Sequence, residues 1–198
     1  RKVIDLQEDD IAVIYSDHHE INNLKSQSIL RPSRTLAWDV KAAEKQGHDH
    51  FMLKEIMEQP QAVASAMRER VNFETRQVVL PDFPLTSQEI ADLERVVLIG
   101  CGTSLNAALV GRYLVERYSG IPAEAESASE YRYRDPAIGP NTLVVSIGQS
   151  GETADTVAAM QMVKDKGGRL ITICNTEGSQ ASRIADGSLY MRSGIEIG

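Results

Sequence analysis

A regular alternation of short apolar runs and helical stretches from Arg95 onward is the feature that most constrains the fold of this chain. The runs are rich in β-branched residues, as in 95–99 (Arg-Val-Val-Leu-Ile) and 142–147 (Thr-Leu-Val-Val-Ser-Ile). Such runs are typical of strands buried on both faces of a parallel sheet. Because the connections are short and contain helices, we predict an α/β fold, a doubly wound parallel five-stranded sheet with helices on both faces. Strands are expected at 95–99, 123–128, 142–147, 170–174 and 188–191, helices at 105–118, from about 153 to 166 and at 182–185, and a short polar stretch at 130–134.

The sequence before residue 51 has weaker periodicity. Alternating residues in 3–6 and 11–15, on either side of an acidic turn, predict a short β-hairpin. Residues 16–50 are polar and contain the breakers Pro32 and Gly47. We expect a weakly ordered linker there.

Residues 51–94 predict a helical segment in front of the sheet. The helical period begins at Phe51, and Pro60 is expected to end a first helix because proline lacks the backbone N–H. A second helix is expected at 62–71, and a further helical stretch at 87–93.

Composition excludes several classes of partner. The net charge of −7 disfavours a nucleic-acid surface, and no apolar run approaches the roughly 20 residues of a membrane span. We therefore expect neither a nucleic-acid nor a membrane partner, and an anionic ligand would need a local binding device. Cys101 and Cys174 each follow an apolar run, and the sequence shows no secretory signal. We therefore expect free thiols and a cytoplasmic location. The chain starts at Arg1 and stops at Gly198, and we expect it to be part of a longer protein.

Two glycine- and hydroxyl-rich loops carry the chemistry of this sequence. Each follows a predicted buried strand and enters the first turn of a helix, at 100–104 and at 148–153. Glycine lets backbone N–H groups approach a ligand, and the helix dipole favours an anion at a helix N-terminus. In open α/β sheets, ligands bind beyond the carboxyl ends of the strands. The candidate binding residues are Gly102, Thr103, Ser104, Gly148, Gln149, Ser150, Gly151 and Thr153.

Each loop also has a structural interpretation. Ser150 is expected to cap the following helix, which ordinary strand-to-helix turns also require. Neither loop contains Lys or Arg, and Glu152 and Asp155 add negative charge in the first turn, although both suit a helix N-terminus. A dinucleotide site is a weaker alternative, since Gly100 and Gly102 begin its fingerprint but Leu105 occupies the third glycine position. Glu124 or Glu126 would be its ribose-binding carboxylate.

The remaining candidates favour structural roles. His18-His-Glu20 and His48-Asp-His50 resemble metal ligands but stand alone in polar segments, so we expect no metal site. Cys101 is expected to be a small buried residue rather than a nucleophile. The run Tyr131-Arg-Tyr-Arg134 is expected to form a packed aromatic pair with solvated arginines.

Several motifs resemble the glutamine–fructose-6-phosphate aminotransferase family. Cys101-Gly-Thr-Ser104, Ser129-Glu-Tyr-Arg-Tyr-Arg134 and Gln149-Ser-Gly-Glu-Thr-Ala-Asp-Thr156 are similar to its sugar-isomerase (SIS) domain. His50-Phe-Met-Leu-Lys-Glu-Ile-Met-Glu-Gln-Pro60 is similar to the segment that joins its glutaminase and isomerase domains, and Asp10-Ile-Ala-Val13 to its last glutaminase strands.

The resemblance implies that the loops hold a sugar phosphate, fructose 6-phosphate or glucosamine 6-phosphate. Its contacts would come chiefly from Ser104, Gln149, Ser150 and Thr153. The family usually has serine at Gly148, so one hydroxyl contact is replaced by a backbone N–H or a water. We expect no cofactor and no catalytic residue in this chain, because the family's nucleophile and acid–base residues lie in parts that have no counterpart here. The full-length enzyme would be a homodimer.

Two alternatives stay open: a phosphosugar-sensing regulatory SIS module without catalysis and, more weakly, a stand-alone phosphosugar isomerase.

The resemblance also divides the chain. The expected segments are the end of a glutaminase domain at 1–30, a linker at 31–50, a helical lead-in at 51–94 and a first SIS domain at 95–198.

Overall fold

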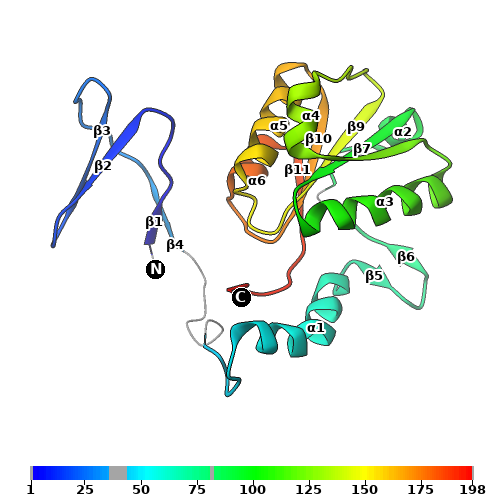
Figure 1. Cartoon of the computed structure of the whole chain (residues 1–198), viewed down its shortest axis with the longest axis horizontal. Helices are drawn as coiled ribbons and strands as arrows, with labels where there is room; N and C mark the ends of the chain where they lie inside the picture. Colours follow the sequence, from blue (N-terminus) through cyan, green and yellow to red (C-terminus); the bar gives the residue numbers. More distant parts are fainter. Residues whose placement is uncertain (1, 36–43, 81–82, 198) are drawn as a thin grey trace. The chain divides into compact units, whose positions relative to one another are not determined.

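The computed structural model describes residues 2–35, 44–80 and 83–197. They fall into two compact units, one made of the residues up to Lys54 with those after Gly194, and one made of Glu55–Gly194. The second unit contains the predicted sheet (Figure 1).

Five parallel strands form this sheet in the order β11-β10-β9-β7-β8. The predicted fold class is confirmed, because each strand lies at its expected position and helices cover the sheet on both faces. The strands are β7 Arg95–Gly100, β8 Ala123–Ser127, β9 Thr142–Ile147, β10 Arg169–Cys174 and β11 Gly187–Tyr190. The helices are α3 Thr103–Ser119, α4 Ala128–Arg134, α5 Ala154–Asp165 and α6 Gln180–Ile184.

The core lies in two layers because successive strand residues face opposite sides of the sheet. In β7, Val97 and Ile99 pack in a cluster with residues of α4, α5 and α6, including Met160. Val96 and Leu98 pack on the other face with Ala108 of α3. An apolar run that alternates between two cores therefore fixes the strand from both sides.

The helix α4 corrects the expectation of a short polar stretch at 130–134. Its first residue, Ala128, and Tyr131 are both buried in the core, one turn apart. Two buried residues at this spacing are enough to hold a short helix on the sheet, although the residues around them are polar.

The described part of the first unit contains two small antiparallel pairs of strands. Strand β1, Lys2–Ile4, pairs with β4, Ser33–Thr35, and β2, Asp10–Ile14, pairs with β3, His19–Asn23. The predicted hairpin is therefore wrong, because β1 and β2 pair with other strands and not with each other. The expectation of a weakly ordered linker is wrong for β3 and β4, which are paired strands, while residues 36–43 lie outside the described residues.

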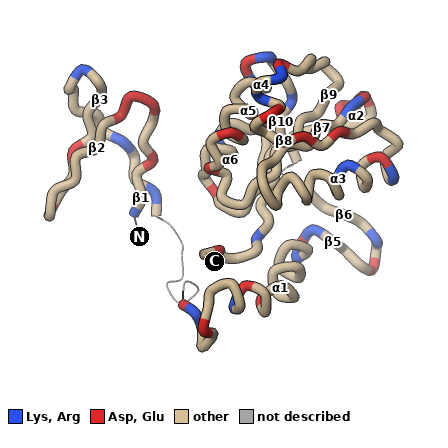
Figure 2. Tube along the Cα trace, viewed as in Figure 1, with Lys and Arg blue, Asp and Glu red and all other residues tan. Residues whose placement is uncertain are grey.

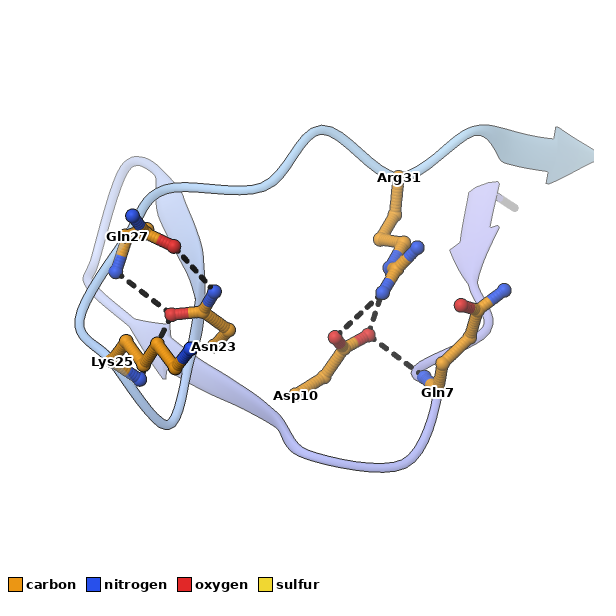
Figure 3. Close-up of polar contacts among 6 residues, drawn as sticks. All are labelled: Gln7, Asp10, Asn23, Lys25, Gln27 and Arg31. Atoms are coloured by element: carbon orange, nitrogen blue, oxygen red, sulfur yellow. Dashed lines mark hydrogen bonds and ion pairs between the residues drawn. The ribbon is translucent and has the colours of Figure 1, made fainter.

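A partly buried ion pair holds the turn between β1 and β2 (Figure 3). The Asp10 carboxylate accepts hydrogen bonds from Arg31 Nε at 2.9 Å and Nη2 at 2.8 Å, and a third from the Gln7 backbone N–H at 2.8 Å. The Asp10 side chain is 1% exposed. These hydrogen bonds, that of Arg31 first, hold the pKa of Asp10 below its ordinary value.

The segment before the sheet contains one long helix, α1, at Phe51–Met67. Pro60 lies inside this helix, so the expected break and second helix are wrong. A small antiparallel pair follows, β5 at Val71–Asn72 with β6 at Gln77–Val78. The expected helical stretch after it is α2, Ser87–Ala91, which begins with a capping box between Thr86 and Glu89.

Candidate functional site

The two predicted loops lie at the point where the strand order reverses. Strands β7 and β9 are parallel neighbours, but the chain leaves β7 toward β8 and leaves β9 toward β10, on opposite sides. The loops that follow β7 and β9 therefore flank one crevice at the carboxyl edge of the sheet, where open α/β sheets bind their ligands.

The first loop brings the end of β7 close to the end of β9. A Cβ at Gly100 would lie 3.0 Å from the carbonyl oxygen of Ile147. Gly102 is the N-cap residue of α3 and has a φ of 57°. The hydroxyls of Thr103 and Ser104 form no hydrogen bond with the part of the chain that the structure describes. Two hydroxyls thus stand free in the first turn of α3.

The second loop presents free donors in the same way. Across residues 2–35, 44–80 and 83–197, no acceptor is found for the backbone N–H groups of Gln149, Ser150 and Gly151. The Gln149 side chain and the Thr153 hydroxyl are equally unbonded within these ranges. Donors without partners at the start of two helices form an arrangement suited to an anion.

Two residues of this loop differ from the expectations. The N-cap residue of α5 is Thr153, not Ser150, and the Ser150 hydroxyl accepts a hydrogen bond from the Glu152 N–H at 3.2 Å. The Gly148 N–H donates to the Ile173 carbonyl at 3.0 Å, so it cannot replace a hydroxyl contact to a ligand.

The carboxylates beside the loops are occupied by other groups. Asp155 pairs with Arg132 at 3.1 Å. Glu152 accepts hydrogen bonds from the backbone N–H of Gln180 at 2.9 Å and from its side-chain amide at 2.6 Å. Charges of both signs are interspersed over the second unit (Figure 2), so an anionic ligand would need a local arrangement of donors.

Contacts beneath the loops join them to each other. The Thr156 hydroxyl in α5 lies 3.7 Å from the Cys101 sulfur in the first loop. A cavity of about 10 Å³, room for about one water, lies under the second loop beside the hydroxyls of Ser146 and Thr172, which are 2.7 Å apart. This cavity under the second loop is therefore lined mostly by small side chains.

The alternative sites have structural partners instead. Glu124 pairs with Arg95 at 2.6 Å and Glu126 pairs with Arg134, so both candidate ribose-binding carboxylates are engaged. Tyr133 is 75% exposed while Tyr131 is buried, so the expected packed aromatic pair is wrong.

The described residues contain neither a metal-binding cluster nor a membrane-spanning helix. No group of three or more His, Cys, Asp and Glu side chains in them is placed to hold a metal ion. No helix among them is long and apolar enough to cross a membrane. Cys101, half-buried, and Cys174, buried, are both free thiols.

Comparison with protein families decides the relationship. Residues 89–198 match the family model of the SIS domain. The chain belongs to the SIS domain family. The SIS fold also matches the C-terminal domain of a glucosamine-fructose-6-phosphate aminotransferase from Francisella tularensis, with a TM-score of 0.71 and 35% identity over 78% of this chain and 43% of that chain.

The similarity extends beyond the SIS domain. Two curated proteins named glutamine–fructose-6-phosphate aminotransferase (isomerizing) are similar over 100% of this chain and 32% of their own length. They come from Mycolicibacterium smegmatis, at 41% identity, and Caldanaerobacter subterraneus subsp. tengcongensis, at 42%. This chain thus spans about a third of the length of these relatives, and the resemblance predicted from the motifs is confirmed.

Proposed function

We propose that this chain is the part of a glutamine–fructose-6-phosphate aminotransferase that holds the sugar phosphate. The observation that carries the proposal is the set of donors without partners at the N-termini of α3 and α5, across one switch point of the sheet. The similarity to aminotransferases over the whole chain supports the same substrate class. No described feature favours a regulatory module.

The phosphate is bound by hydroxyls and N–H groups rather than by basic side chains. Ser104, Ser150 and Thr153 donate hydroxyl hydrogen bonds, and Gln149 donates its side-chain amide. The N–H groups of Gly102 and Gly151 and the hydroxyl of Thr103 complete the set. Neutral donors and helix dipoles hold a dianion firmly enough to orient it, and they release a charged product more readily than an ion pair would.

In the whole enzyme, the bound fructose 6-phosphate is aminated and isomerised to glucosamine 6-phosphate. This chain supplies the binding loops and no catalytic residue, and the reaction needs no cofactor. Its N-terminal segments represent the end of a glutaminase domain and the linker to the isomerase part. The whole enzyme is a cytoplasmic homodimer.

The test is a calorimetric titration of the chain with fructose 6-phosphate. We expect Ser150→Ala and Thr153→Ala each to weaken binding about ten- to a hundredfold, because each removes a hydrogen bond to a charged acceptor. Fructose without its phosphate should bind no tighter to the parent chain than to these variants. The control is Ser87→Ala, which removes an exposed hydroxyl from α2. If both loop variants keep the affinity and the melting temperature of the parent, the phosphate does not bind at the second loop.

A further inference from the structure

The second loop is braced by the segment that follows β10. The Asn175 N–H donates to the Gln149 carbonyl at 2.9 Å, and the Ala181 N–H donates to the Gly151 carbonyl at 3.0 Å. These two bonds occupy the carbonyl groups of Gln149 and Gly151. The N–H groups of the same two residues have no acceptor within the described residues.

Glu152 completes this brace from its side chain. Helix α6 begins at Gln180, and its first three N–H groups all have acceptors. The Glu152 carboxylate accepts from the Gln180 N–H, and the Gly151 carbonyl accepts from the Ala181 N–H. The Ser182 N–H donates to the hydroxyl of Ser179, the N-cap residue of α6. Two of the three acceptors thus come from the second loop, so the loop and the start of α6 hold each other in place.

Steric contact enforces the same fit. Gly151 has a φ of +68°, and a Cβ there would lie 2.3 Å from the Ser179 hydroxyl oxygen. The Ser179 side chain is buried directly against the loop. Little room is left for the loop to move without breaking its bonds to α6.

The negative charge of Glu152 leads to two hypotheses about its effect on phosphate affinity, and they predict changes in opposite directions when the side chain is removed. A carboxylate next to N–H groups that receive a phosphate repels that phosphate, so a purely electrostatic view makes Glu152 unfavourable for binding. Its hydrogen bonds to Gln180 act in the opposite direction, because they keep several donors in one arrangement at once. Removing the side chain has opposite consequences in the two views.

We infer that Glu152 is a positioning residue, which by tying the second loop to α6 holds the donors of residues 149–153 in the arrangement that receives the phosphate. The inference rests on the proposed function for its ligand but not for its structural part. Glu152 itself does not touch the ligand.

The first measurement is amide hydrogen exchange in the ligand-free chain. Glu152→Ala should speed exchange at Asn175, Gln180 and Ala181, whose N–H groups are hydrogen-bonded to the second loop, and leave the strands β7 and β9 unchanged. Glu152→Gln keeps one acceptor for the Gln180 N–H and should restore most of the protection. The matched control is Glu177→Gln, which removes the same charge from an exposed position before α6.

The second measurement is the affinity for fructose 6-phosphate. Glu152→Ala should weaken binding about five- to tenfold, the loss expected when a charged hydrogen bond no longer holds the donors. Glu152→Gln should recover most of this loss, and Glu177→Gln should bind as the parent does or slightly tighter. Comparing the melting temperature of each variant with that of the parent identifies any loss of affinity caused by unfolding.

The outcomes separate the two hypotheses. Tighter binding by Glu152→Ala, or unchanged exchange at Asn175 and Ala181, overturns the positioning role and leaves the proposed function standing. If the parent chain does not bind fructose 6-phosphate, the proposed function fails, and faster exchange in Glu152→Ala alone still supports Glu152 as the residue that holds the loop.

Discussion

At the scale of single residues, the two glycines of the second loop have different roles. Gly151 needs its positive φ and has no room for a side chain, whereas Gly148 has neither constraint, since a Cβ there would meet its nearest neighbour at 4.0 Å. We expect Gly151→Ala to destabilise the chain by about 1–3 kcal/mol through backbone strain and overlap with Ser179.

Gly148→Ser should leave stability within about 0.5 kcal/mol and tighten fructose 6-phosphate binding by up to about tenfold, because it adds a hydroxyl donor. Thermal melts and calorimetry on the pair check both, and a Gly148→Ser variant that melts far below the parent would contradict the assignment.

The sequence predicted where the site residues lie but not what each one bonds. Because parallel strands all end at the same edge of a sheet, predicting that each loop follows a parallel strand is enough to bring Ser104 and Thr153 to one edge. The partner of Glu152 is 28 residues away in sequence, at Gln180, so no local pattern indicates it. The prediction that Ser150 caps α5 was wrong, because the first helical residue is Ala154 and its N-cap is therefore Thr153.

At the scale of elements, α1 is stable enough to include a proline. Pro60 cannot donate to the Ile56 carbonyl and its ring crowds that turn. We expect Pro60→Ala to stabilise the helix by up to about 3 kcal/mol. Far-UV circular dichroism during thermal melting measures the change, and Gln59→Ala, at the neighbouring exposed position, is the control. Loss of helical signal in Pro60→Ala would show that the proline is required for the helix.

Short elements were the ones that sequence patterns missed. Strand β3 has one buried residue, Ile21, and β4 has none, so both lack the alternation of buried residues that identifies a strand. Their pairing with β2 and β1 defines them. The buried strands β7 and β9 were located within one residue because both faces are covered and both cores select apolar side chains.

At the scale of the whole molecule, the two units should lose stability at opposite ends of the pH range. In the first unit, the native pKa of Asp10 lies below its ordinary value of 3.8. Its contribution is therefore present above that value and is lost as pH falls through the native pKa. Nuclear magnetic resonance signals of residues 10–31 should weaken on acidification before those of the sheet. In Asp10→Asn this acid dependence should be reduced, while Glu8→Gln, at an exposed position, should behave as the parent does.

The second unit should be sensitive to alkali through Tyr131. Burial raises the pKa of Tyr131 from 10.0 to about 12, so the native state keeps the proton after the unfolded chain has lost it. Stability should therefore fall between pH 10 and 12, by about 2–3 kcal/mol at the upper end. Tyr131→Phe should flatten this decline in denaturant titrations, and the exposed Tyr133→Phe should not. An equal decline in all three proteins would rule out Tyr131 as its source.

The position of the loops on β7 and β9 also determines which changes the site tolerates. Both strands lie inside the sheet, each paired on two sides, while β8 and β11 form its edges. An edge strand can lengthen, fray or gain a neighbour without shifting the register between β7 and β9. Sequence drift and the attachment of further domains are thus expected to concentrate at β8 and β11, with the crevice between the central strands inherited unchanged.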